Sequence, residues 1–159
     1  VYSSVDGVLL YKNEITGAME LSYYPIGKKG AYTIPDGVTE IPLRLFEGTQ
    51  ITEVTIPTSV AVIREKAFYG CTTITKVSFA EGGTDGLIIE DGAFQNCTNL
   101  TTLTLPARLT ELQVNEETHT LTLFTGCNAL THINIEKGNQ NYASIDGVIT
   151  NKIGQLIFC

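Results

Sequence analysis

Apolar residues recur along this chain in short clusters with a fixed internal spacing. Ile51, Val54 and Ile56 set the pattern, in which two residues separate the first apolar position from the second and one separates the second from the third. An incomplete copy comes earlier, at Tyr32 and Ile34. Three complete copies follow at Ile74-Val77-Phe79, Leu100-Leu103-Leu105 and Leu130-Ile133-Ile135. Because alternate side chains of a strand point to the same face, each cluster predicts a short strand with one buried face.

A phenylalanine lies between successive strands, and cysteine or threonine follows it three residues later. These phenylalanines are Phe46, Phe68, Phe94 and Phe124, at spacings of 22, 26 and 30 residues. From the end of each strand to its phenylalanine the chain takes 11, 11, 14 and 18 residues. The additional residues fall at 82–86 and 113–120. Insertions confined to one point of a period are typical of loops on one face of a solenoid.

The repeated unit predicts a solenoid. A unit of about 23 residues cannot bury its apolar stripe alone, so neighbouring units must stack around one shared core. The spacing L-x-x-L-x-L is the strand signature of leucine-rich repeats. We therefore predict a mostly β leucine-rich-repeat solenoid, a right-handed superhelix of parallel stacked strands. The side chains expected to point into its core are Val54, Ile56, Val77, Phe79, Leu103, Leu105, Ile133 and Ile135.

Two further elements are expected in each repeat. Short apolar stretches between the first strand and the phenylalanine predict a second strand at 38–41, 60–63, 87–89 and 109–112. The segment around each phenylalanine, such as 66–69, is too short for a stable helix and predicts a single helical turn.

The two ends of the chain carry a different motif. Residues 2–9, YSSVDGVL, return as residues 142–149, YASIDGVI, at an offset of 140. Asp-Gly between β-branched residues indicates a hairpin with a type I′ turn. We predict hairpin segments at 1–27 and 139–159, with about four to five repeats over 28–138. Because the start lacks an initiator methionine and a signal sequence, and the end repeats the beginning, we expect a segment of a longer protein.

Composition excludes some classes of function. The chain of 159 residues is 43% hydrophobic and 17% charged, which is typical of a folded protein. It carries 10 basic and 17 acidic residues, a formal charge of -7, which argues against nucleic acid as a partner. No apolar run reaches the roughly 18 residues of a membrane helix, so we expect no membrane insertion of this segment.

The repeats resemble the BspA-like leucine-rich-repeat family. Its unit has the form I-P-x-x-V-T-x-I-x-x-x-A-F-x-x-C-x-x-L-x-x-V, and residues 56–77 read IPTSVAVIREKAFYGCTTITKV. The Tyr-x-Ser-Ile/Val-Asp-Gly-Val segment is also similar to the hairpin that interrupts such arrays. The chain departs from the family at 113–120 and at Thr49, which replaces a cysteine. The resemblance implies a surface-exposed or secreted protein of a host-associated bacterium, with an adhesion or protein-binding role and no cofactor.

The cysteines and histidines are better explained by structure than by chemistry. Cys71, Cys97 and Cys127 share one repeat position, so we expect a ladder of small buried thiols, as free cysteine is often buried. A disulfide between adjacent coils and a metal site are the less favoured alternatives. Cys159 is the fourth cysteine, and the sequence predicts no pairing for it. His119 and His132 are expected on the surface.

The sequence contains no catalytic motif. The glycine-rich stretch 82–86 lacks the lysine and the following helix of a phosphate-binding loop. Asp85, Glu90 and Asp91 do not match a calcium-loop frame. We therefore predict no catalytic residue, no metal ligand and no cofactor, and a chain that is not an enzyme.

Two surfaces remain as candidates for binding. The first is the outward face of the strands, formed by Glu53, Thr55, Lys76, Ser78, Thr102, Thr104, His132 and Asn134. The second is the long loop, with Asn115, Glu116, Glu117 and His119. Solenoids use extended surfaces of the first kind for binding, and irregular loops often carry function.

The favoured function is a non-enzymatic protein-interaction or adhesion module of a cell-surface or secreted bacterial protein. Its partner would be a protein, such as a surface protein of a host or a neighbouring cell. One alternative is a structural spacer that presents another domain. The other is a glycan-binding module, which would need exposed aromatic platforms. The tyrosines that could supply them are Tyr2, Tyr11, Tyr23, Tyr24, Tyr32, Tyr69 and Tyr142.

Overall fold

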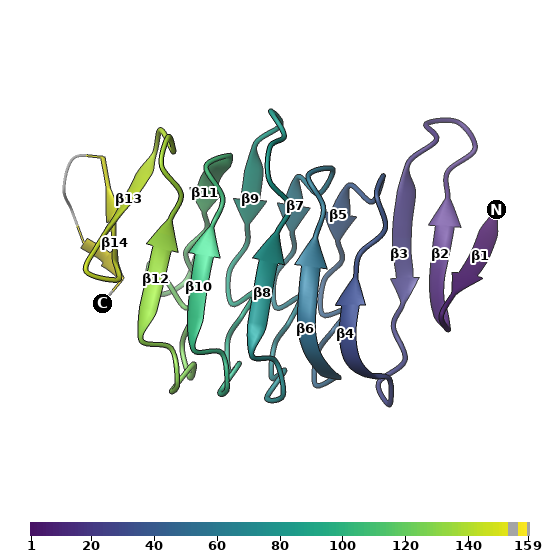
Figure 1. Ribbon diagram of the computed structural model, residues 1–159, viewed down its shortest axis with the longest axis horizontal. Coiled ribbons are helices and arrows are strands. Elements are labelled where there is room, and N and C mark those ends of the chain that lie inside the picture. The colour runs from purple at the N-terminus through teal and green to yellow at the C-terminus, as the bar shows by residue number, and fades with distance from the viewer. Residues whose placement is uncertain (153–155, 159) are drawn as a thin grey trace.

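The computed structural model describes residues 1–152 and 156–158 and is a solenoid of stacked coils with a small antiparallel sheet at each end (Figure 1). We call one turn of the solenoid a coil. One side of the stack is formed by parallel strands: β4 (Lys29–Thr33), β6 (Gln50–Ile56), β8 (Lys76–Phe79), β10 (Thr102–Leu105) and β12 (His132–Ile135). These strands lie at the predicted clusters, so the sequence located the repeats correctly.

A second parallel sheet runs behind the first. Its strands are β5 (Glu40–Ile41), β7 (Val62–Ile63), β9 (Leu87–Ile89) and β11 (Leu109–Leu112), hydrogen-bonded in the order β11-β9-β7-β5. Each lies within a predicted second strand. The front strands are divided instead into two sheets, β4-β6-β8 and β10-β12. The stack is therefore continuous at the back and interrupted at the front, between β8 and β10.

The third side of each coil consists of tight turns. Hydrogen bonds close these turns over three residues, for example from Tyr69 N to Lys66 O at 3.0 Å. Lys66 has a φ of 54°, which breaks any helical path. Phe68 N donates to Ala93 O of the next coil at 2.8 Å, and not to a residue of its own turn. The expected single helical turn is therefore replaced by successive turns, because hydrogen bonds between coils compete for the same groups. No helix occurs in the described residues.

The core is a ladder of phenylalanine rings enclosed by the two sheets. Phe46 and Phe68 stack at 4.8 Å between ring centroids, Phe68 and Phe94 at 5.2 Å, and Phe94 and Phe124 at 6.2 Å. Tyr24 extends the ladder at its amino-terminal end, 4.8 Å from Phe46. The predicted inward positions point into this core. Fully buried are Val54, Ile56, Val77, Leu103, Leu105 and Ile133, while Phe79 and Ile135 are half-buried.

The end sheets have the predicted hairpins. At the amino-terminal end β1 (Tyr2–Val5), β2 (Val8–Lys12) and β3 (Met19–Tyr23) form one sheet, and at the other end β13 (Tyr142–Ile145), β14 (Val148–Asn151) and β15 (Leu156–Phe158) form the second. Both residues of each Asp-Gly pair have positive φ, as a type I′ turn requires: 50° and 78° in the first, 52° and 81° in the second. Cys159 lies outside the described residues.

Candidate interaction surface

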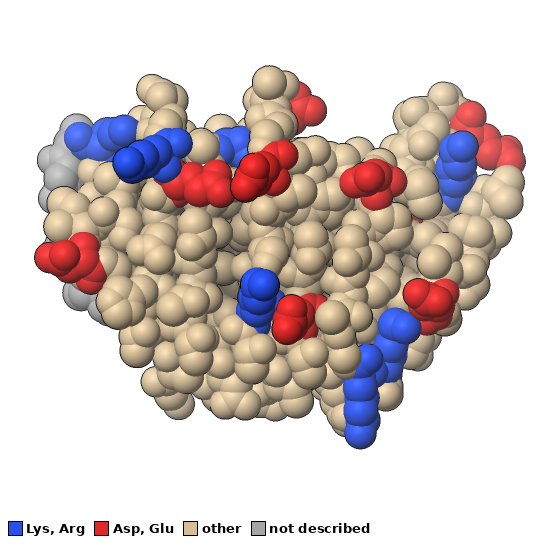
Figure 2. All heavy atoms as spheres, viewed as in Figure 1, with Lys and Arg blue, Asp and Glu red and all other residues tan. Residues whose placement is uncertain are grey.

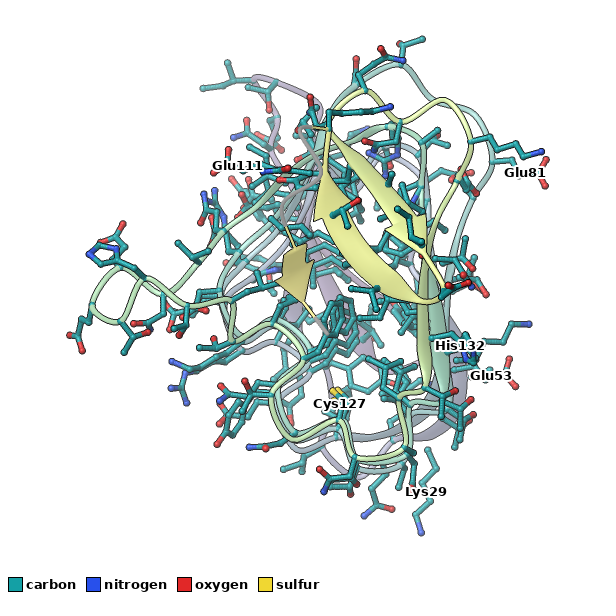
Figure 3. The ribbon with its side chains drawn as sticks, turned by 90° about the vertical axis from the view of Figure 1, so that its left-hand side faces the viewer. Lys29, Glu53, Glu81, Glu111, Cys127 and His132 are labelled. Carbon is teal, nitrogen blue, oxygen red and sulfur yellow. The ribbon has the colours of Figure 1, made fainter. Side chains whose placement is uncertain are left out.

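The outward side chains of β4, β6, β8, β10 and β12 form one continuous side of the molecule, which we call the strand face. The pairing of the strands places the predicted residues in two rows. One row contains Glu53, Lys76, Thr102 and His132, and the other contains Thr55, Ser78, Thr104 and Asn134. Glu53 and His132, from distant coils, lie on the same side in Figure 3. The structure thus brings all eight predicted residues to one face. Ala31 and Thr33 of β4, which pair with Glu53 and Thr55, extend the rows and were not predicted.

The strand face is mostly uncharged, with a few charged side chains across it and more along its upper edge (Figure 2). The two rows themselves are rich in threonine, which suits a β-sheet surface. Six of the eight predicted residues are exposed, and Thr55 and Ser78 are half-buried. A surface of this kind loses little hydration energy when a partner covers it, because it has few charges to desolvate.

A groove of about 270 Å³ opens in the strand face where the front sheet is interrupted. Its lining is Lys76, Val77, Ser78, Phe79, Thr102, Thr104 and Glu136. Phe79 stands where the other coils have Ile56 or Leu105, and its larger ring is only half-buried. Phe79 and Glu136 were not predicted as site residues, because the periodicity assigns the first to the core and leaves the second beyond the strand. The sequence signal for Phe79 was an aromatic residue at a position that is aliphatic in the other coils.

The two ends of the groove carry opposite charges. Lys76 is exposed at the start of β8, and Glu136 follows the end of β12. One carboxylate oxygen of Glu136 accepts a hydrogen bond from Ala107 N at 2.9 Å, which fixes the side chain. Among the described residues Lys76 forms no ion pair, so its ammonium group is available to a partner.

The loop 113–120 projects from the side opposite the strand face (Figure 3). Its candidate Asn115 is engaged within the protein: Nδ2 donates to Asp91 Oδ2 at 2.9 Å, and Oδ1 accepts hydrogen bonds from Glu117 N and Thr118 N. Glu116, Glu117 and His119 are exposed. Asn115 therefore organises the loop, and the two predicted surfaces are not brought together.

The loop borders a hollow of about 660 Å³ whose lining includes six acidic side chains: Glu65, Glu90, Asp91, Glu111, Glu116 and Glu117. Part of this charge is compensated. Arg64 NH1 donates to Glu90 Oε1 at 2.8 Å, and Lys66 Nζ donates to Glu65 Oε1 at 2.6 Å. In residues 1–152 no group of three or more His, Cys, Asp or Glu is placed to hold a metal ion.

The repeat cysteines form the predicted ladder of buried thiols. Each Sγ donates to the carbonyl of the phenylalanine one coil earlier, at 2.8 Å for Cys71, 3.2 Å for Cys97 and 3.1 Å for Cys127. All three are free thiols, and Thr49 fills the same position in the first coil. Burial raises the pKa of Cys71 to about 11, and a hydrogen bond with Cys127 together with burial raises the pKa of Cys97. Thiols held protonated in this way are poor nucleophiles.

The buried Cys71 thiol predicts a loss of stability at alkaline pH. The Cys71 pKa is 9.0 without burial and about 11 in the fold, so between these values the unfolded chain releases a proton that the folded chain retains. The stabilising contribution is present below pH 9 and falls by about 2 kcal/mol up to pH 11. Cys71→Thr, which copies Thr49, should therefore flatten the decline. Urea unfolding of both proteins in reductant at pH 8 to 11 measures this, and parallel curves would contradict it.

Two comparisons place the chain among known proteins. Residues 27–146 match the model of a BspA type leucine rich repeat region in six copies. The chain belongs to the BspA-type leucine-rich-repeat family. These repeats are typical of bacterial surface proteins and generally serve as non-enzymatic protein-binding scaffolds. No curated protein matches the chain. The described residues include no helix of a length and apolarity that would cross a membrane.

Solved structures share this BspA-type fold. A leucine-rich repeat protein from Bacteroides capillosus is 27% identical with a TM-score of 0.66, and the match covers 85% of this chain and 98% of that one. A leucine rich cell surface protein from Faecalibacterium prausnitzii is 26% identical with a TM-score of 0.60, and the match covers 85% of this chain. The chain spans only 39% of that protein's length. The pneumococcal vaccine antigen PcpA, at 20% identity and a TM-score of 0.60 over 96% of this chain and 54% of that one, shares the fold.

Proposed function

We propose that this BspA-type chain is a protein-binding module of a cell-surface or secreted bacterial protein, and that it binds through the strand face. The groove between β8 and β10 carries the proposal. It is a hollow in the strand face, lined by four of the eight predicted residues together with the half-buried ring of Phe79. Solenoid proteins use such extended surfaces for partners.

The groove has the features of an interface centre. The half-buried ring of Phe79 can be covered by a partner's side chain, and aromatic residues in sheltered pockets contribute most of the binding energy in many interfaces. Lys76 and Glu136 at opposite ends supply charges of both signs, which suits an extended peptide segment with complementary charges. The threonine rows around the groove supply a polar rim.

The alternative functions have less support. A glycan site needs exposed aromatic platforms, but Tyr24 and Tyr32 are buried in the core. Tyr2 and Tyr23, which are largely exposed, lie on the amino-terminal hairpin and outside the groove. A spacer needs no groove at all.

Replacing Lys76, Thr104 and Asn134 together by alanine should weaken binding of a protein partner about tenfold or more while the melting temperature stays unchanged, because all three side chains are exposed. The partner is sought by passing the chain over an array of purified extracellular proteins, and its affinity is measured by biolayer interferometry. The control variant carries Glu116→Gln, Glu117→Gln and His119→Ala in the loop and should bind as the natural chain does.

Each of the remaining outcomes would contradict the proposal and favour a different site or function. Loss of binding only in the loop variant would move the site to 113–120. No protein partner, together with hits on a glycan array, would favour sugar recognition. No ligand in either array would favour a spacer.

A further inference from the structure

The two hairpins have the same internal structure. Tyr2 pairs with Tyr11 and Val5 with Val8, as Tyr142 pairs with Asn151 and Ile145 with Val148. The residues directly before the hairpins, Val1 and Asn141, also correspond. Lys12 N donates to Val1 O at 2.8 Å, and Lys152 N donates to Asn141 O at 3.1 Å. Every residue of one hairpin thus has a counterpart 140 positions away. The two copies differ in their surroundings.

The carboxy-terminal hairpin is seated on the last coil. The Tyr142 hydroxyl accepts a hydrogen bond from Leu112 N at 2.9 Å. Ser144 Oγ donates to Ile133 O at 2.6 Å, and Gly147 O accepts from Ile133 N at 3.1 Å. The contact at the turn is tight: a Cβ on Gly147 would lie 3.0 Å from the ring of His132.

These contacts cap the solenoid. Inside the stack each coil's backbone groups bond to the following coil, as when Thr131 N donates to Thr101 O at 2.9 Å. The last coil has no described coil beyond it, and buried backbone groups without partners are costly. Ser144 and the Tyr142 hydroxyl supply the missing partners, so the hairpin recognises the open end of a coil.

The amino-terminal hairpin presents the same groups to solvent. Tyr2 is 66% exposed, and Ser4 and Gly7 are exposed as well. A Cβ on Gly7 would meet only Pro25, at 3.9 Å. Within the described part of the chain, neither the Tyr2 hydroxyl nor Ser4 Oγ has a hydrogen-bond partner. The strand that carries them, β1, is the outermost strand at that end (Figure 1).

We propose that Tyr2, Ser4 and Gly7 form a docking surface for the open end of a leucine-rich-repeat stack like the one that ends with β11 and β12. We call these three residues the open hairpin face. The seated copy in the same molecule shows which occupant fits: a coil with free backbone groups at the positions of Leu112 and Ile133. Val1 O accepts the same hydrogen bond as Asn141 O, so a coil can join the hairpin in one polypeptide through a connection like residues 136–141, between β12 and β13.

The test is a tandem protein in which residues 1–141 are followed directly by residues 2–159. The offset of 140 places Tyr2, Ser4 and Gly7 after this splice at the positions that Tyr142, Ser144 and Gly147 hold in the seated hairpin. We expect one rigid, continuous solenoid in small-angle X-ray scattering and a single unfolding transition. A flexible pair of bodies, or two independent transitions, would overturn the proposal.

Point variants identify the contacts. At the inner junction of the tandem, Tyr2→Phe and Ser4→Ala should each lower the melting temperature by about 2–4 °C, and in the single chain they should change nothing. Ser3→Ala is the matched control, because its counterpart in the seated hairpin is already Ala143. Equal effects of all three variants in the tandem would overturn the assignment. So would self-association of single chains that Tyr2→Phe abolishes, since a second copy would then be the occupant.

Discussion

Phe68→Ala should lower the free energy of unfolding by about 3–5 kcal/mol, the usual cost of removing a buried aromatic side chain. Phe68 is completely buried and stacks on both sides, 4.8 Å from Phe46 and 5.2 Å from Phe94. Its removal opens a cavity in the middle of the ladder, where neither adjacent coil can close without losing its hydrogen bonds to the next. Because repeat stability depends on contacts between neighbours, we also expect a less cooperative transition. Urea unfolding measured by circular dichroism checks both.

Phe68→Leu is the control for the ladder. Leucine refills part of the volume but not the stacked ring, so we expect a loss of about 1–2 kcal/mol and a single transition. If Phe68→Ala cost no more than the leucine variant, the ladder would not be the main source of cohesion between coils.

Arg108→Ala should lower the free energy of unfolding by about 1–3 kcal/mol, because it leaves the buried Val60 carbonyl without a donor. Arg108 is 9% exposed and reaches back across the stack. Its NH1 group donates to Val60 O at 2.8 Å and to Asp85 O at 3.4 Å, and its NH2 group donates to Pro57 O at 3.4 Å. Burial lowers the pKa of Arg108, with Asp85 opposing the shift. Chemical denaturation at neutral pH measures the loss.

Side chains in other coils donate hydrogen bonds to the equivalent carbonyl groups, as Arg108 does. The carbonyl three residues after each strand-end proline receives a side-chain donor: Ser59 Oγ at Val38, Arg108 at Val60 and Asn139 Nδ2 at Leu109. The third coil carries the inserted loop 82–86, so the donor to the second coil comes from the fourth and has to be long. The long side chain of Arg108 therefore compensates for the insertion at 82–86.

Arg64→Ala is the matched control for Arg108→Ala. Arg64 forms ion pairs with Glu40 at 2.7 Å and Glu90 at 2.8 Å, but its side chain is 42% exposed. Solvent-exposed pairs contribute little, so we expect a loss below about 1 kcal/mol. An Arg108→Met variant as stable as the natural protein would show that the cost of burying the charge offsets its hydrogen bonds.

The sequence by itself determined the repeats, both sets of strands, the phenylalanine and cysteine ladders and the two hairpins. It could do so because burial in a solenoid is periodic: alternate positions of each strand face the core, and every coil repeats the previous one. The prediction of a helical turn around Phe68 was wrong. Local length favoured a turn of helix, but the hydrogen bonds from one coil to the next are not visible in the local sequence.

Only the tertiary structure decided where the strand face opens and which hairpin is covered. The groove depends on whether β8 and β10 form hydrogen bonds with each other. The role of Arg108 depends on which carbonyl groups lack a donor because of the inserted loop 82–86. The hairpins make the distinction clearest, because Tyr2 and Tyr142 stand in nearly the same sequence. One is exposed and the other caps Leu112, since contact with a coil is a property of position in the stack and not of the residues themselves.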